Sequence, residues 1–409
     1  MNVLHCADLH FDDEAGRLKN TILCCDQVIA SAQAESPDLI VIAGDVYDKG
    51  LILGSPGTLA AIEFVQRCGN VAPVVITSGT PTHDAANSTE VFNKLNTAHS
   101  IHATSIPHQI GLAKDGRFIP INGDLKIPEL AALVSCLPSV TRAGLMGMRS
   151  CSLEETRIEA AELLRDLFQA WGVVNGKANL LGVPTVLVGH GTVRGSCLST
   201  GQRVTDPDAE FGIADLKLTK AALICLGHIH MRQQIHENAF YAGSITRADH
   251  GETEEKGFFM HIIDEKAVSS RFIETPARIM RTFKPEGLPD TALLESVMEG
   301  EYVRIVYTVK EEDVARVDEA SLVRLAYEKG AAHVKIDKTV IPVTNVRAEG
   351  ISRLASLEEK LKRWGELNGQ PITEGLLGKL HLLRTADEET ILSDYLKKER
   401  PDETAVFAA

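Results

Sequence analysis

The sequence lacks the features that mark membrane, exported and cysteine-scaffolded proteins. It contains no run of about 18 to 20 uninterrupted apolar residues, so no membrane-spanning helix is expected. Its first residues carry no charged-then-apolar leader, and we therefore expect a cytoplasmic protein that does not contact a membrane. None of its eight cysteines forms a C-x-x-C pair, which argues against a zinc ribbon and a disulfide framework.

Two further absences limit the possible functions. No G-x-x-x-x-G-K-[ST] loop occurs, so any dependence on ATP would have to come from a partner protein. The chain also lacks an excess of positive charge, with 42 Lys plus Arg against 56 Asp plus Glu and a net charge of -14. The chain as a whole should repel nucleic acid, so a polyanionic substrate must be met by local charge, bound metal or a partner.

The 409 residues, 44% of them hydrophobic, are enough for more than one domain. Short apolar runs alternate with helix-like stretches in the first 80 residues, which indicates repeated β-α-β units. The runs show no polar alternation, so we expect strands that are covered on both faces. The expected strands span 3–7, 39–43 and 74–77, and the expected helices span 18–35 and 58–67.

A break in the pattern near Thr275 and Pro276 suggests a domain boundary. We expect an α/β protein with a first domain at 1–274, a small α/β domain at 275–347 that includes a helix at 311–329, and a helical region at 348–409.

The helical region carries an apolar stripe and a final capping signal. Thr385 to Glu388 fits a capping box that begins a last helix. The stripe could be buried within its own domain or on another chain. Its residues, at spacings of three and four, are Leu354, Leu357, Leu361 and Trp364.

Asp and His residues directly follow apolar strands in five short segments. The i, i+2 spacing of two of them sends both side chains to one side of an extended strand end, as two ligands of one site require. In open α/β sheets, ligands bind at the carboxyl ends of strands. The segments are Asp8-Leu9-His10, Gly44-Asp45-Val46-Tyr47-Asp48, His83-Asp84, Gly189-His190 and Gly227-His228-Ile229-His230.

Mixed carboxylate and imidazole donors suit Mn, Fe or Zn better than Mg or Ca. Two such ions about 3.5 to 4 Å apart can clamp both oxygens of a phosphoryl displacement, and a carboxylate has to bridge them. Asp45 is the candidate bridge. A single D-x-H or G-H-x-H is weak evidence, but five segments in strand context favour a metal site over structural histidines.

The ordered set D-x-H, G-D-x-x-D, H-D, G-H and G-H-x-H resembles the calcineurin-like metallophosphoesterase superfamily. The stretch from Tyr241 to Glu252, followed by Lys256-Gly257-Phe258, resembles a segment of SbcD-type DNA repair nucleases. The resemblance implies a β-sandwich flanked by helices, followed by a small α/β capping domain and C-terminal helices. It also implies a metal-dependent DNA exonuclease, with or without endonuclease activity, that processes DNA ends.

The resemblance further implies a role for individual residues. His83 would be the catalytic acid, tethered by Asp84, while Asp48 would hold a ligand or His83 in orientation. Thr82 stands where the family has an asparagine ligand, and its hydroxyl is a weaker donor to the second of two divalent ions, for which Mn²⁺ is expected. Asp8, His10, Asp45 and His230 would bind the first ion, and Asp45, His190 and His228 the second.

The implied partners are DNA, a second copy of the chain, and an SbcC-like coiled-coil ATPase gripped by the C-terminal helices. Arg142, Arg149 and Arg194 lie on expected loops and are weaker candidates for DNA contact. The main candidates could equally be solubilising charge: Arg247, Arg271, Arg278, Arg281 and Lys284. Two alternative functions are a stand-alone phosphodiesterase or phosphatase for small molecules and a scaffold with a degenerate metal site.

Overall fold

The structure is a computed structural model. It describes residues 1–50, 52–121, 127–140, 155–199, 211–264, 267–342, 351, 354–388 and 390–392. Arg142 and Arg149 lie outside these residues. Contacts divide the chain into two units, one of Met1–Thr308 with Arg316–Thr339 and one of Val309–Ala315 with Val340–Ala409. The grouping does not separate residues 275–308 from the first domain, and the domain boundaries drawn from the sequence stay predictions.

Two sheets lie at the centre of the larger unit. The first has the strand order β13-β12-β1-β2-β3-β4, and the second has the order β10-β11-β9-β8-β7-β5-β6. The first sheet contains β1 (Asn2–Cys6), β2 (Leu39–Ala43), β3 (Val74–Thr77), β4 (Ile101–Thr104), β12 (Gly257–Ile263) and β13 (Val268–Glu274). The second contains β5 (His108–Ala113), β6 (Phe118–Pro120), β7 (Leu130–Leu137), β8 (Thr185–His190), β9 (Leu223–Gly227), β10 (Gln233–His236) and β11 (Ala239–Tyr241).

The strands β1, β2, β3, β8 and β9 are buried on both faces, as the short apolar runs of the sequence predict. Along β1, Val3 belongs to the layer between the sheets, whereas Leu4 and Cys6 belong to the layer beneath the helices. This alternation follows from the two-residue period of a strand. The layer between the sheets, which we name the inner layer, contains Val41 of the first sheet and Val134 of the second.

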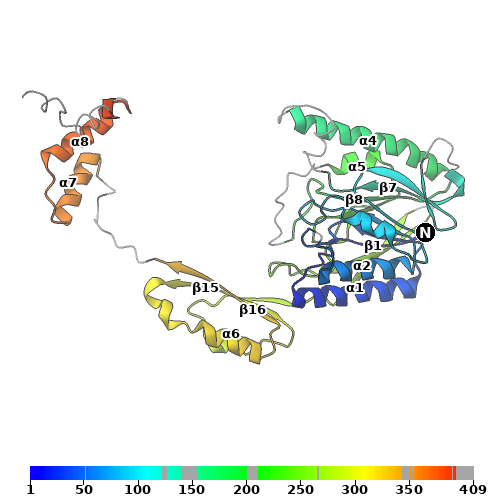
Figure 1. Cartoon of the computed structure of the whole chain (residues 1–409), viewed down its shortest axis with the longest axis horizontal. Coiled ribbons are helices and arrows are strands. Elements are labelled where there is room, and N and C mark those ends of the chain that lie inside the picture. Colours follow the sequence, from blue (N-terminus) through cyan, green and yellow to red (C-terminus); the bar gives the residue numbers. More distant parts are fainter. Residues whose placement is uncertain are drawn as a thin grey trace, which may run out of the picture. The chain divides into compact units, whose positions relative to one another are not determined.

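Helices cover both outer faces of the sandwich (Figure 1). Val28 of α1 (Ala15–Glu35) and Phe64 of α2 (Pro56–Gly69) pack on the first sheet. Phe168 of α4 (Glu155–Leu180) and Leu216 of α5 (Ile213–Leu218) pack on the second. The expected α/β sandwich flanked by helices is confirmed. Short 3-10 helices span Thr89–Lys94, Ile127–Glu129, Thr291–Leu294 and Glu311–Arg316.

A third sheet, of order β14-β15-β16, lies after the sandwich in sequence. The continuous helix predicted at 311–329 is wrong, because the segment is divided into a 3-10 helix and α6 (Glu319–Glu328). The division occurs at Asp318, whose side chain accepts from Ser321 N at 3.0 Å and caps α6. The strands are β14 (Met280–Phe283), β15 (Tyr302–Lys310) and β16 (His333–Ile341).

The smaller unit contains α7 (Leu357–Leu367) and α8 (Glu374–Thr385). The predicted capping box at Thr385 is wrong. Thr385 ends α8, and its hydroxyl donates to His381 O at 2.8 Å, so it is not free to cap the next turn. Asp387 takes that position instead and accepts from Thr390 N at 2.8 Å. No described helix is both long and apolar enough to cross a membrane.

Candidate metal centre

The five motif segments lie at the carboxyl ends of β1, β2, β3, β8 and β9, where the sandwich brings them together. Asp8 N donates to Gly44 O at 3.0 Å, which joins the ends of β1 and β2. The carboxylate of Asp8 accepts from His228 N at 2.8 Å, which joins β1 of one sheet to β9 of the other. Both sheets therefore supply side chains to one site.

The first donor cluster consists of Asp8, His10 and His230, whose ligand atoms lie within 4.8 Å of one another. His230 Nδ1 donates to Glu252 Oε1 at 2.8 Å, so its Nε2 carries the lone pair. That Nε2 lies 3.0 Å from His10 Nε2. Two ligand atoms at right angles on one ion, each bound at about 2.1 Å, are separated by about 3 Å. The two rings thus already have the spacing of a ligand pair.

The second cluster consists of Asp45, His190 and His228, within the same 4.8 Å limit. His190 Nδ1 donates to Ala43 O at 2.7 Å, which leaves its Nε2 3.3 Å from Asp45 Oδ1. The same carboxylate oxygen accepts from Thr80 N at 2.7 Å. These bonds fix the ring and the carboxylate before any ligand arrives, as outer-shell partners do in metal sites.

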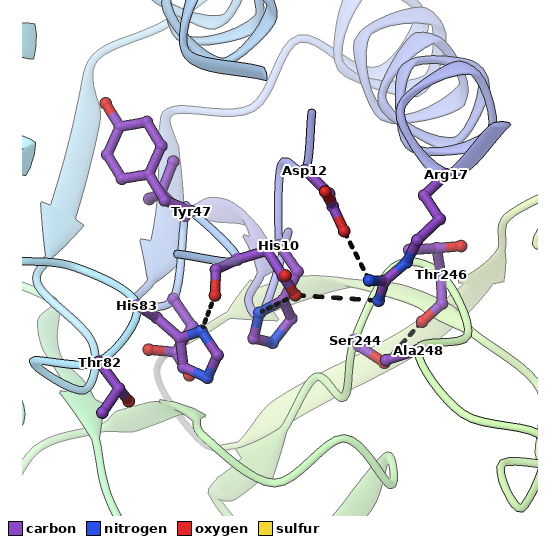
Figure 2. A network of polar contacts seen from close by, with 12 residues as sticks. His10, Asp12, Arg17, Tyr47, Thr82, His83, Ser244, Thr246 and Ala248 are labelled. Carbon is purple, nitrogen blue, oxygen red and sulfur yellow. Dashed lines mark hydrogen bonds and ion pairs between the residues drawn. The ribbon is translucent and has the colours of Figure 1, made fainter. Parts of the chain in front are cut away.

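His83 lies beside the first cluster, and its ring centroid is 4.7 Å from that of His10 in an edge-to-face arrangement (Figure 2). Its Nδ1 donates to the backbone carbonyl of Asp48 at 2.5 Å, and Nε2 is the nitrogen left to exchange a proton. The carboxylate of Asp48 lies 3.9 Å from His10 Nδ1 and 3.8 Å from Arg17 Nη2. Asp48 thus contacts both histidines, one through its backbone and one through its side chain.

Asp84 does not tether His83, which corrects the sequence prediction. Its carboxylate accepts from Gly79 N at 2.7 Å, from Val46 N at 3.1 Å and from Tyr47 N at 3.2 Å. It therefore clamps the loop after β3 to the loop after β2. A short carboxylate buried beside three backbone amides satisfies donors that would otherwise be unpaired.

Thr82 is exposed, and its hydroxyl donates to Thr80 Oγ1 at 3.3 Å (Figure 2 shows its place beside His83). Thr80 Oγ1 in turn donates to Asp45 Oδ1 at 3.1 Å. The threonine that contacts a candidate ligand is therefore Thr80, which sequence reasoning missed because the family's motif points to Thr82.

Four of the candidate ligands have a left-handed backbone. Asp8, His10, Asp45 and His228 have φ values of 51°, 47°, 50° and 96°, and they are four of the seven such non-glycine residues described. This conformation costs about 1 to 3 kcal/mol for a residue with a Cβ, and it persists where the surroundings impose it. A Cβ on Gly79 would lie 2.0 Å from Asp45 Oδ1, so only glycine lets the loop approach that carboxylate.

Buried ligand atoms that have no hydrogen-bond partner show whether the site fits a cation. Among the described residues, Asp8 Oδ2, His10 Nδ1 and His190 Nε2 have none. Burial raises the pKa of Asp8 to about 6, against the opposing effect of His190, and burial lowers the pKa of His228 to about 3. A neutral imidazole such as that of His228 and a destabilised carboxylate such as that of Asp8 gain free energy from a bound cation. The six donors of the two clusters therefore fit two divalent ions.

Glu252 and Lys256 were part of a recognised motif, but sequence reasoning gave them no role. Glu252 Oε1 accepts from His230, and its other oxygen lies 3.0 Å from Lys256 Nζ. Burial alone would raise the pKa of Glu252, but the hydrogen bond from His230 and the charge of Lys256 lower it to about 2. Glu252 thus orients a candidate ligand from behind.

The candidate DNA-binding residues differ in what they contact. Arg247 donates to Arg278 O at 3.0 Å and to Glu254 O at 2.8 Å, and Arg278, 6% exposed, donates to Arg247 O at 2.7 Å. These two guanidinium groups hold the junction to the third sheet, which does not favour DNA contact. Arg194 pairs with Asp215 at 3.3 Å. The remaining candidates are Arg271, paired with Glu35, Arg281, which donates to Ser296 O at 2.6 Å, and the exposed Lys284.

Residues 1–232 match the family model described as calcineurin-like phosphoesterase. The chain therefore belongs to the calcineurin-like phosphoesterase family, and with its two donor clusters it is a metal-dependent phosphoester hydrolase that takes two divalent ions. The chain is similar to the SbcD subunit of the nuclease SbcCD of Staphylococcus saprophyticus, at 23% identity over 313 residues that cover 73% of this chain and 74% of the relative. Among solved structures, a dimetal phosphatase from Danio rerio matches at 11% identity and a TM-score of 0.36, covering 67% of this chain and 99% of that one.

Proposed function

We propose that the protein is a metal-dependent DNA nuclease of DNA end processing and repair that acts as an exonuclease, with or without endonuclease activity. The observation that carries the proposal is the likeness to the SbcD subunit of the nuclease SbcCD. It covers 73% of the chain, so it extends beyond the phosphoesterase match that ends at residue 232. A small-molecule phosphatase would need no further domains, whereas a long polyanion needs additional surface to hold it.

In this proposal Asp8, His10 and His230 hold one ion, His190 and His228 hold the other, and Asp45 bridges them. Mn²⁺ is the ion we propose, because mixed carboxylate and imidazole sites suit it. Bound there, two ions supply an activated water and neutralise the charge that develops on the phosphate oxygens.

His83 is the proposed general acid. Its Nδ1–H is held by the carbonyl of Asp48 at 2.5 Å, so Nε2 is directed away from that bond and can protonate the leaving sugar oxygen. Asp48 and Asp84 act as positioning residues. Asp48 holds His83 and faces His10, and Asp84 fixes the two loops on which Asp45 and His83 lie. Thr82 is at most an indirect contributor, through Thr80.

The net charge of -14 means that DNA has to be held by local charge. The exposed Arg271 and Lys284 and the half-buried Arg281 are the proposed contacts. The proposed protein partner is an SbcC-like coiled-coil ATPase, and the proposed surface for it lies on α7 and α8. Leu357 and Trp364 of α7 are 57% and 38% exposed, and Leu383 of α8 is 64% exposed, so both helices present apolar side chains that a helical partner could cover. A homodimer is also proposed.

The test compares wild type with His83→Ala on end-labelled duplex DNA and on bis-p-nitrophenyl phosphate, with Mn²⁺ or Mg²⁺. We expect Mn²⁺-dependent shortening of DNA, which the variant loses by about 10²- to 10⁴-fold while its metal content is unchanged. His99→Ala, at an exposed histidine, is the matched control.

The other outcomes separate the alternatives. Cleavage of the small ester without cleavage of DNA, alone or with an SbcC-like ATPase, would favour a small-molecule phosphodiesterase. Cleavage of neither, together with loss of one ion, would favour a scaffold.

A further inference from the structure

A further group of side chains that could bind a metal lies outside the candidate centre, between the two sheets. His102, His108 and Cys136 place their ligand atoms within 4.8 Å of one another. The three residues come from β4 of the first sheet and from β5 and β7 of the second. We propose that this triad, which we name the edge triad, is a further metal site that takes a borderline-soft divalent ion such as Zn²⁺.

Strand geometry directs the three side chains toward one point. On β4, Ala103 packs beneath the helices, so the neighbouring His102 faces the inner layer. On β5, Ile110 and Leu112 belong to the inner layer, so His108 shares that face. Cys136, another inner-layer residue, is the direct antiparallel partner of His108 across β5 and β7. Residues paired in this way have side chains on the same side of the sheet.

The imidazoles already have the hydrogen-bond pattern of a ligand pair. His108 Nδ1 lies 2.8 Å from Ile106 O and has to donate to it, because a carbonyl can only accept. Its Nε2 therefore carries a lone pair, and that atom lies 2.9 Å from His102 Nε2. Metal-bound histidines commonly donate their second N–H to a backbone carbonyl in this way. The same approach of two Nε2 atoms, at 3.0 Å, occurs between His10 and His230.

Another triad of two histidines and a cysteine lies in the same layer, and the hydrogen bonds of its ring nitrogens differ from those of the edge triad. His5, His261 and Cys225 also lie within the 4.8 Å limit. His5 Nε2 donates to Leu226 O at 3.1 Å, His261 Nε2 then donates to His5 Nδ1 at 3.3 Å, and Ser270 Oγ donates to His261 Nδ1 at 2.7 Å. All four ring nitrogens are used, so a metal would have to break this chain of hydrogen bonds. In the edge triad a metal would replace only the hydrogen bond between the two Nε2 atoms, and His108 Nδ1 would keep its bond to Ile106 O.

Access and ligand chemistry favour the edge triad as well. His102 and His108 are half-buried, so an ion can reach them from solvent, while Cys136 is fully buried and protected. Imidazole and thiolate are both ligands of Zn²⁺, and a zinc site with three protein ligands keeps a fourth position for water. On binding, the thiol proton of Cys136 passes to solvent and the His102 proton moves from Nε2 to Nδ1, so that three lone pairs bind the ion. The ion would join the edge of the first sheet to the second sheet.

Cobalt gives a readout that the candidate phosphoesterase centre cannot produce. That centre has only nitrogen and oxygen donors, whereas a thiolate on Co²⁺ gives a charge-transfer band in the near ultraviolet. We expect the metal-stripped full-length protein to develop this band with Co²⁺, and Zn²⁺ to abolish it by displacement. Cys136→Ser should abolish the band, and His108→Gln should weaken Co²⁺ binding by at least about tenfold. Cys225→Ser and the exposed Cys197→Ser should keep it.

The wild-type spectrum alone can overturn the proposal, because absence of the band means that no thiolate binds the ion. A band that persists in Cys136→Ser and disappears in Cys225→Ser would place the metal in the other triad. Circular dichroism identifies a variant that fails to fold, and His108→Gln then gives an independent test at a half-buried position.

Discussion

The first strand of the protein carries histidines in two contrasting environments. His5 lies inside β1, on regular strand backbone, and both of its ring nitrogens are hydrogen-bonded. His10 lies just past the end of the same strand, with φ of 47° and a buried Nδ1 that has no hydrogen-bond partner among the described residues. Both side chains are almost fully buried, at 0% and 6% exposed. Residue type and burial therefore do not distinguish a structural histidine from a candidate ligand, whereas unused lone pairs and a strained backbone do.

The largest expected effect comes from Asp45→Asn, which keeps the size of the side chain but removes the charge from the proposed bridge. We expect the variant to retain fewer ions and to hydrolyse bis-p-nitrophenyl phosphate more than about 100-fold more slowly, because loss of a direct ligand exceeds the 10- to 100-fold typical of an outer partner. Metal analysis after dialysis measures the number of retained ions, and the rate of ester hydrolysis measures the activity. Asp26→Asn at an exposed ion pair is the control, and full metal content in Asp45→Asn would contradict the bridge.

A smaller effect is expected from Glu252→Gln. The amide can no longer accept as strongly from His230 Nδ1, so His230 is held less well and is a weaker donor. We expect metal affinity to fall by about 10- to 100-fold while the rate at saturating metal changes less. Titration of the stripped protein with Mn²⁺ measures the affinity. Glu254→Gln, which removes another partner of Lys256, should leave it near wild type.

The structural histidines of the inner layer should make the protein less stable in acid. Burial lowers the pKa of His261 to about 3, below its usual 6.5, so the unfolded chain binds a proton that the folded chain does not. Stability contributed by His261 is therefore present above pH 6.5 and is lost as the pH falls from 6.5 toward 3, by about 1.4 kcal/mol per unit. Urea unfolding of metal-free protein between pH 7.5 and 5 measures the slope, which His261→Gln should reduce and the control His99→Gln should not.

The smallest effect is expected at Thr82. Its side chain is exposed and contacts Thr80, so Thr82→Asn should leave metal content unchanged and alter the rate by no more than about twofold, the range of a surface substitution. A large gain in activity with Asn would instead show that position 82 reaches the second ion.

Much of the fold follows from local pattern. Leu39–Ala43 and Val74–Thr77 are strands with the predicted bounds, because short apolar runs between helices have few alternatives. Strand ends also predict where Asp and His residues meet, since neighbouring parallel strands end at the same edge. The sequence does not show which distant residue a side chain contacts when the two lie on different loops or strands. Asp84 contacts amides of a distant loop and not the adjacent His83, and His102 meets Cys136 from another sheet.

The two donor clusters each take ligands from both sheets, and this couples metal loading to the closure of the sandwich. Asp8 and His10 extend from the first sheet while His230 extends from the second, and Asp45 faces His190 in the same way. A cation held by both sheets binds the closed sandwich only, so by mass action it stabilises that state by about 2.7 kcal/mol at a free concentration of 100 times its dissociation constant. Substitutions deep in the inner layer, far from any ligand, should consequently change how tightly the protein holds its metals.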